Sequence, residues 1–268
     1  MTEVRDDLYL KALIDPIRVC AQYRPKMGQG AGAGLSLEEF QALYRADPFY
    51  SWYGLDHPMM YAAHKAAGGM TSVYRQVGIG AERLFRLILQ DQLGLSAEQT
   101  RWSYQTRSPS GRTRTLSLDG RIELGAVNDS TKRKRIQAWM TAAADDLGVA
   151  KEIQKTLKGA VFEVRQGYKS KDSKRQNADI ANASTAYTRA YLPCVVVLST
   201  QIDSDIVTRY RNERWAILTG GVAERSTIRS TYAFVRDVVG FDLASFFERN
   251  SDKLRAEVDK VLHALLTA

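Results

Sequence analysis

The stretch Tyr191–Thr200, YLPCVVVLST, is a continuous apolar run that contains three consecutive valines. It shows no alternation of polar and apolar side chains over its first seven residues. A run of this kind, rich in β-branched residues, is typical of a central strand that is covered on both faces of its sheet. Such strands belong mainly to sheets whose strands are joined by helices. The stretch therefore predicts an α/β fold class.

Further strands and helices are predicted on both sides of this central strand. Apolar and β-branched residues predict strands over 159–171 (GAVFEVRQGYKSK) and 213–221 (ERWAILTGG). The alternating segment 112–124 (RTRTLSLDGRIEL) predicts a β-hairpin that turns at Asp119-Gly120. Apolar residues at helical spacing predict helices over three segments: 78–95, 131–148 and 251–266. This order of elements favours a mixed β-sheet flanked by helices.

The 268 residues show no internal repeat and no linker that would separate a second domain. We therefore expect a single domain over 1–268, since a chain of this length can bury one large core. Within it, residues 1–75 are expected to form a helical N-terminal extension. Residues 76–221 form the core that carries the strands, and residues 222–268 form the C-terminal helices.

The composition of the chain favours an anionic partner. Lys and Arg number 38 and Asp and Glu number 30, which gives a formal net charge of +8. Polyanions such as nucleic acids are attracted to proteins of this kind. Two cysteines are too few for a disulfide framework or a cysteine zinc site. The acidic start MTEVRDDLYL is unlike a secretion signal, and no segment is apolar enough to span a bilayer. We expect a cytoplasmic protein with no membrane partner.

Acidic and basic side chains gather on the predicted strand 159–171. Side chains of a strand alternate between its faces, so Phe162 and Val164 should face one way. The charged side chains should share the other face: Glu163, Arg165, Lys169 and Lys171. Asp119 ends the preceding strand, and Glu82 comes from a helix that can pack on the same sheet. Carboxylates and a lysine in this arrangement suggest a Mg²⁺ site that activates water and offsets charge on a phosphodiester.

The segment after this strand, 171–182 (KDSKRQNADIAN), combines two kinds of DNA-binding side chain. Lysine and arginine neutralise phosphates, whereas arginine, asparagine and glutamine also read base edges. We expect DNA contacts from six residues: Arg165, Lys171, Lys174, Arg175, Gln176 and Asn177. The basic run Lys132–Arg135 is a second candidate for phosphate contact.

The order of these motifs resembles that of type II restriction endonucleases of the PD-(D/E)XK nuclease superfamily. The resemblance covers roughly 78–221. It consists of GIGAERLFRLIL with the helix glutamate, LDGRIEL with the hairpin aspartate, VFEVRQGYKSKDSKRQNADI as catalytic strand, and YLPCVVVLSTQID as the following strand. It is nearer to ApaLI-like enzymes than to those that cut CCGG-type sites.

The resemblance implies a restriction-endonuclease-like fold and a two-fold symmetric homodimer. It also implies Mg²⁺-dependent hydrolysis of both strands of a short palindromic site in double-stranded DNA. As part of a restriction-modification system, such an enzyme has a cognate DNA methyltransferase encoded nearby. Catalytic and metal-binding roles then fall on Asp119, Glu163 or Asp179, and Lys169.

Two assignments of the catalytic residues remain open at this point. The first takes Asp119, Lys169 and Asp179, with Glu82 in support. The second takes Asp119, Glu163 and Lys169 or Lys171. Each acid also has a purely structural interpretation: a turn residue at Asp119, an Arg86 partner at Glu82, a buried ion pair at Glu163, and a cap for a helix near Ile180 at Asp179.

Two other functions are compatible with the same charges. A non-catalytic sequence-specific DNA-binding protein would use the basic strand only for docking. A metal-dependent RNA nuclease would use the same carboxylates on a different substrate.

Overall fold

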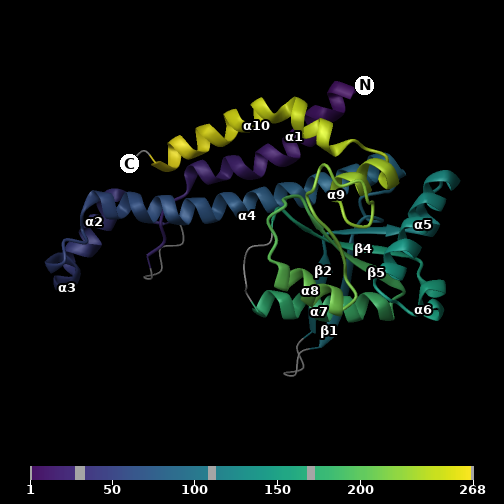
Figure 1. Ribbon diagram of the computed structural model, residues 1–268. Helices are drawn as coiled ribbons and strands as arrows, with labels where there is room; N and C mark the ends of the chain where they lie inside the picture. Colours follow the sequence, from purple (N-terminus) through teal and green to yellow (C-terminus); the bar gives the residue numbers. More distant parts are fainter. Residues whose placement is uncertain (1, 28–33, 108–112, 168–172, 267–268) are drawn as a thin grey trace. The chain divides into compact units, whose positions relative to one another are not determined.

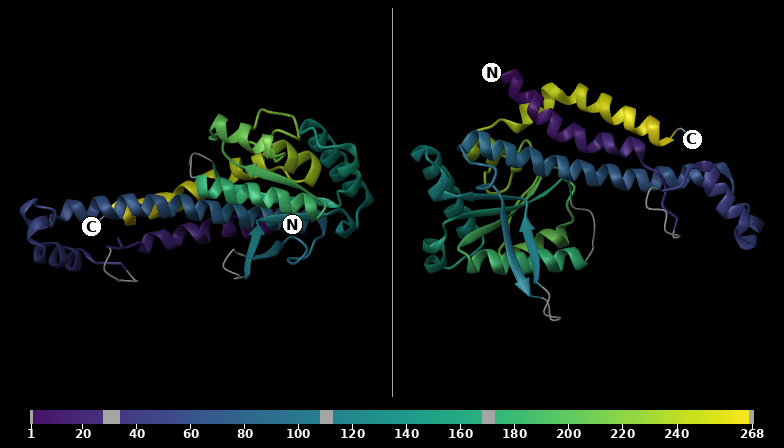
Figure 2. Two further views of the ribbon diagram at one scale, coloured as in Figure 1. Left: turned by 90° about the horizontal axis from the view of Figure 1, so that it is seen from below. Right: turned by 180° about the vertical axis from the view of Figure 1, so that it is seen from behind.

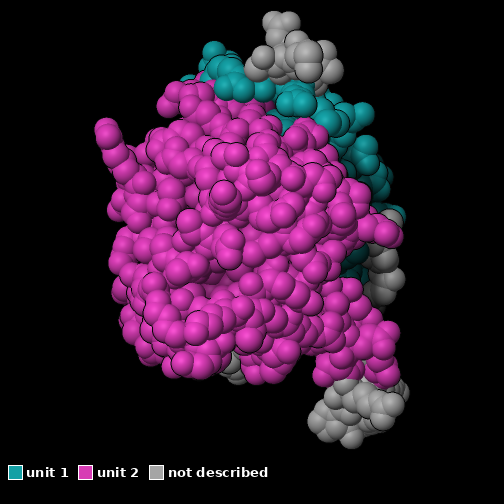
Figure 3. Space-filling view, turned by 90° about the vertical axis from the view of Figure 1, so that its right-hand side faces the viewer, with its two compact units in different colours: residues 1–80, 249–268 teal, residues 81–248 magenta. Residues whose placement is uncertain are grey.

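The computed structural model describes residues 2–27, 34–107, 113–167 and 173–266 (Figure 1). The chain forms two compact units, shown in two colours in Figure 3. Unit 1 comprises residues 1–80 and 249–268, and unit 2 comprises residues 81–248. This division differs from the sequence-based one because it groups the end of the last helix with the N-terminal helices.

The regular elements of unit 1 are helices in its described residues. They are α1 (Thr2–Arg18), η1 (Val19–Gln22), α2 (Leu37–Ala46), α3 (Pro48–Trp52), the first part of α4 (Pro58–Leu93) and most of α10 (Leu243–Leu266). In Figures 1 and 2, α1 and α10 run beside α4. A buried apolar cluster joins α1, η1, α4 and α10: Ile17, Cys20, Val73, Val261 and Leu265. The predicted helical character of the N-terminal part is therefore observed.

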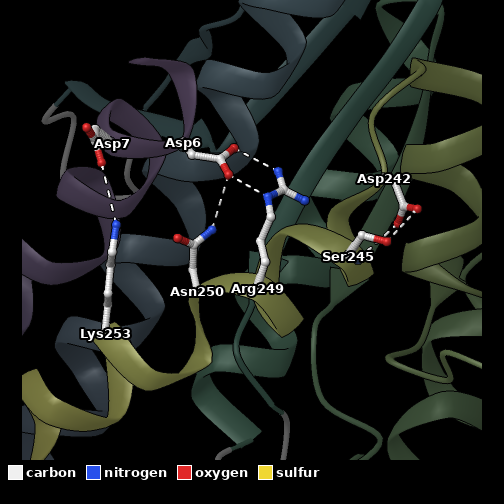
Figure 4. A network of polar contacts seen from close by, with 7 residues as sticks. All are labelled: Asp6, Asp7, Asp242, Ser245, Arg249, Asn250 and Lys253. Carbon is white, nitrogen blue, oxygen red and sulfur yellow. Dashed lines mark hydrogen bonds and ion pairs between the residues drawn. The ribbon is translucent and has the colours of Figure 1, made fainter. Parts of the chain in front are cut away.

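Ion pairs join α1 to α10. Arg249 donates to both carboxylate oxygens of Asp6, at 2.5 and 2.7 Å, and Asn250 donates to the same carboxylate (Figure 4). Arg18 donates to Glu257 at 2.7 Å. These contacts between α1 and α10 explain why the C-terminal helix, distant in sequence, belongs to the N-terminal unit. At the start of α10, in unit 2, Asp242 accepts hydrogen bonds from the backbone N–H and hydroxyl of Ser245.

Unit 2 contains a four-stranded mixed sheet of order β3-β4-β5-β6. Its strands are β3 (Gly120–Glu123), β4 (Gly159–Arg165), β5 (Tyr191–Val197) and β6 (Ala216–Leu218). β3 is antiparallel to β4, whereas β4, β5 and β6 are mutually parallel. All seven residues of β5 are buried. The prediction of a central strand covered on both faces, in an α/β protein with a mixed sheet, is confirmed.

Helices cover both faces of this sheet. They are α5 (Ser130–Asp146), α6 (Lys151–Thr156), α7 (Ser173–Thr188), α8 (Ser204–Asn212) and α9 (Thr231–Ala233), with the short turns η2 (Leu124–Ala126) and η3 (Phe234–Val239). On one face Phe162 packs against the rings of Phe85, Trp139 and Phe234. On the other face Val161, Val195 and Val197 join a cluster that includes α7 and α8 side chains.

The predicted hairpin at Asp119-Gly120 is wrong. β2 (Thr113–Leu118) pairs antiparallel with β1 (Trp102–Arg107) in a separate two-stranded sheet, whereas β3 pairs with β4. Leu118 belongs to the same apolar cluster as Trp102 and Tyr104, so burial of this hairpin fixes its pairing. Asp119 consequently stands between two sheets and not at the tip of a hairpin.

None of the helices in the described ranges is long and apolar enough to cross a membrane.

The tight core of unit 2 predicts a sharp difference between two Val→Ala variants. Val197 is fully buried in β5, and its truncation should lower the free energy of unfolding by about 2 kcal/mol because a cavity remains. Val222 is 55% exposed, and the same truncation there should change it by less than about 0.5 kcal/mol. Urea unfolding followed by tryptophan fluorescence measures both; equal losses would contradict the assigned core.

Candidate active site

Arg165, the last residue of β4, is surrounded by carboxylates. Only 8% of the residue is exposed. Its Nη2 lies 2.5 Å from Oε1 of Glu163 and 3.2 Å from Oδ2 of Asp179. Asp179 comes from α7 and also accepts a hydrogen bond from the hydroxyl of Tyr210 in α8. This network joins the end of β4 to α7 and α8. Its charged and polar groups are buried, so each of them needs a charged or polar partner.

Asp119 lies next to this network, directly before β3. Its Oδ2 accepts a hydrogen bond from the backbone N–H of Val164 at 2.8 Å. Its carbonyl accepts from Nη1 of Arg86 at 3.0 Å. Gly120 pairs with Phe162 in the antiparallel register, so one residue earlier Asp119 stands opposite Glu163. The two carboxylates thus come from neighbouring strands at the same end of the sheet.

Gly120 permits this close approach. A Cβ atom at this position would lie 3.1 Å from the ring of Phe85 and 3.5 Å from Cβ of Phe162. Because these neighbours are packed in the core, a Cβ atom at this position would need the ring of Phe85 to shift by a few tenths of an ångström. The glycine thus lets β3 pack closely against Phe85 and Phe162.

The electrostatic surroundings of Asp119 favour its neutral form. Burial raises the pKa of Asp119 above its ordinary value of 3.8. The hydrogen bond from Val164 and the charges of Arg165 and Arg86 lower this pKa in part, whereas the charge of Asp179 raises it. An aspartate with a raised pKa beside further carboxylates is a common feature of functional sites.

The donor set of the cluster is of the kind that Mg²⁺ prefers. Asp119 and Glu163 offer hard carboxylate oxygens, and Mg²⁺ is commonly held by one or two carboxylates together with water and substrate phosphates. Within the described ranges, no group of three or more His, Cys, Asp or Glu side chains is arranged to hold a metal ion. Glu163 and Asp179 each form an ion pair with Arg165, and Asp179 also accepts a hydrogen bond from Tyr210. Asp119 and Glu163 offer the donor atoms of a two-carboxylate site.

Other predicted site residues lie around this cluster or outside the described residues. Glu82 is half-buried on α4, one helical turn before Arg86, which binds the carbonyl of Asp119. Lys169 and Lys171 fall outside the described residues. The predicted DNA-contact residues of the following segment belong to the first two turns of α7: Lys174, Arg175, Gln176 and Asn177.

Two predictions for this region need revision. Asp179 does not cap a helix that begins near Ile180, because α7 already begins at Ser173 and Asp179 lies inside it. Arg165, predicted to contact DNA, is buried with two carboxylate partners. In the basic run 132–135, Lys132 and Arg133 donate to backbone carbonyls of Gln92 and Val127, and Lys134 and Arg135 are exposed.

Sequence reasoning missed two side chains of the cluster, Tyr210 and Arg86. Tyr210 is 1% exposed, and a buried tyrosine hydroxyl needs a hydrogen-bond partner. That requirement is visible only once burial is known. The sequence favours Arg86 as a partner of Glu82, four residues earlier on the helix, and in the structure Arg86 also donates a hydrogen bond to the carbonyl of Asp119.

Comparison of the chain with protein-family models, with curated proteins and with solved structures finds no match.

Asp119 should make stability fall as pH rises. Its folded-state pKa is raised, so between 3.8 and that pKa the folded state binds more protons than the unfolded state, and the free energy of unfolding decreases with pH. Asp119→Asn removes this ionisation and should be more stable than the wild type at neutral pH. The difference should vanish below the ordinary aspartate pKa. Urea unfolding across this pH range measures it; a less stable variant at neutral pH would contradict the raised pKa.

Arg165 should be essential for the stability of unit 2. Arg165→Gln leaves Glu163 and Asp179 buried without their cation, and we expect a loss of about 3–5 kcal/mol in the free energy of unfolding. Arg225→Gln, at an exposed position, is the matched control and should change it by less than about 0.5 kcal/mol. Adding Asp179→Asn to Arg165→Gln should restore part of the loss. An equal loss in the free energy of unfolding for Arg165→Gln and Arg225→Gln would show that Arg165 is not held in a buried network.

Proposed function

We propose that this protein is a type II restriction endonuclease that hydrolyses double-stranded DNA at a short palindromic site with Mg²⁺. The proposal rests on the position of Asp119, which lies directly before β3 and stands opposite Glu163 of β4. This placement supports the sequence resemblance, which combines a hairpin aspartate with an acid on the following catalytic strand. We accordingly propose a restriction-endonuclease-like fold for the mixed sheet of unit 2.

The second of the two sequence-based assignments has the better support. Asp119 and Glu163 would hold Mg²⁺, while Asp179 binds Arg165 and Tyr210. When bound, the ion would activate a water molecule and offset the negative charge that develops on the phosphodiester. Lys169 remains the proposed lysine that orients the attacking water.

Arg165 acts in this proposal as a positioning residue. Its guanidinium holds Glu163 and Asp179 at once, which restrains the Glu163 side chain on the face shared with Asp119. A restrained ligand loses less conformational entropy when substrate and ion bind, so catalysis benefits from the ion pair. This role replaces the direct DNA contact that the sequence suggested for Arg165.

DNA recognition is proposed for the start of α7. This helix follows the strand that carries Glu163, and its first two turns contain the basic and amide residues at 174–177. Base reading next to the cleavage site would couple recognition to hydrolysis. A homodimer would place one such site on each strand of a palindrome, and a cognate methyltransferase would protect the host DNA.

Plasmid cleavage tests the proposal. The wild type should convert supercoiled plasmid into discrete linear fragments in Mg²⁺ and leave it intact in EDTA. Glu163→Gln and Asp119→Asn should each reduce the rate at least about a hundredfold, because each removes a carboxylate that would hold the Mg²⁺ ion. Lys169→Ala should abolish cleavage and leave DNA binding, measured by gel shift.

Glu213→Gln, at an exposed glutamate of unit 2, is the matched control for Glu163→Gln and should cleave like the wild type. Full activity of Glu163→Gln would exclude the assigned site. Binding of DNA with intact plasmid under all conditions would instead favour a non-catalytic DNA-binding protein. Cleavage of structured RNA in place of plasmid would favour the metal-dependent RNA nuclease.

A further inference from the structure

A basic pocket of about 980 Å³ lies in unit 2, where β4 and β5 begin. Four of its lining residues are cations: Arg101, Arg121, Lys158 and Arg189. Glu98 is the acidic residue that lines it. Lys158 directly precedes β4, which runs seven residues to Arg165 at its other end. At a rise of about 3.3 Å per residue, Lys158 lies about 16 Å along the strand from Glu163.

Three of these cations are available for a ligand. In the part of the chain that the structure describes, no carboxylate forms an ion pair with Arg101, Lys158 or Arg189, and all three are exposed. Arg121 has a structural role: its Nε donates to the carbonyl of Gln99 at 2.9 Å, and its Nη1 lies 3.9 Å from Glu123. The pocket therefore combines one fixed arginine with cations that lack anionic partners.

Aromatic rings restrain two of the available cations. Nζ of Lys158 lies 4.9 Å from the ring centroid of Tyr191, and Cζ of Arg189 lies 5.5 Å from that of Tyr104. The faces of aromatic rings attract cations, so these side chains are held near one place instead of sampling solvent freely. The hydroxyl of Tyr191 donates to Glu123 at 3.1 Å, which fixes the ring on which Lys158 rests.

The backbone between these residues is also constrained. Ala190 adopts a φ of +62°, which is uncommon for a residue with a side chain. Its carbonyl accepts a hydrogen bond from the N–H of Lys158 at 2.9 Å. This contact ties the segment that carries Arg189 and Tyr191 to the segment that carries Lys158, so the cations of the pocket keep a defined spacing.

We propose that this pocket binds clustered phosphate groups. Its four cations against one acid call for a ligand with several negative charges, and arginine and lysine together suit the oxygens of phosphate. Two sources share this chemistry, a free polyphosphate and the backbone of a nucleic acid. The proposal needs neither the carboxylate cluster nor hydrolysis, and it stands apart from the proposed function.

Binding measured without divalent cations tests the pocket. Inorganic triphosphate is titrated by calorimetry, and a fluorescent single-stranded oligonucleotide by anisotropy. Lys158→Gln and Arg189→Gln should each weaken binding of the responding probe by about tenfold, because each removes a charged hydrogen-bond donor. Glu98→Gln should tighten it, because it removes the acidic group from the lining. The exposed positions make these variants suitable, and unchanged melting temperatures would confirm that they fold.

Arg225→Gln, an exposed arginine outside the pocket, should bind both probes like the wild type. Binding of triphosphate that the pocket variants weaken would identify a free polyphosphate as a ligand. A response of the oligonucleotide alone, weakened by the same variants, would identify a nucleic-acid backbone. Absence of binding by both probes, or an equal loss in Arg225→Gln, would overturn the proposal.

Discussion

The ion pairs of Arg165 with Glu163 and Asp179 are the interaction on which the arrangement of unit 2 depends. They join the end of a buried strand to a helix that follows it in sequence, and Tyr210 adds a second helix. Burying these charges is costly unless all of them are paired, so α7 is held where Asp179 can reach the guanidinium. The ion pair of Arg165 with Asp179 therefore ties α7 to the end of β4. Arg165 of β4 therefore has a structural role, because it links β4 to α7.

The sequence predicts those parts of the fold whose signals are local. The apolar run of β5 and the periodicity of α5 depend only on neighbouring residues, and both elements are confirmed. The pairing of β2 was missed because its partner β1 is chosen by burial of a shared apolar cluster, not by the Asp-Gly turn signal. The full length of α4 was missed for a similar reason. At Gly69, inside α4, a Cβ atom would come within 2.6 Å of Leu265, so close packing in unit 1 explains the glycine.

The candidate site was predictable to the extent that residue type and strand position determine it. Asp119 was identified from its place at a strand end and Glu163 from the charged face of its strand, and in the structure Asp119, directly before β3, stands opposite Glu163 of β4. The surroundings of Arg165 were not predictable, because alternation along a strand states which face a side chain takes but not what covers that face. Here α7 and α8 cover it with Asp179 and Tyr210, whose contacts depend on packing between elements distant in sequence.

The proposed function requires that the carboxylates at this end of the sheet bind a divalent ion. Burial is the main cause of the raised pKa of Asp119, and a bound cation would favour the ionised form of this carboxyl group. Electron paramagnetic resonance of added Mn²⁺ tests this claim most directly, because the signal of the free aquo ion disappears on binding. The wild type should bind a Mn²⁺ ion, and a variant with both Asp119→Asn and Glu163→Gln should not bind it. Equal Mn²⁺ binding by the two proteins would contradict it.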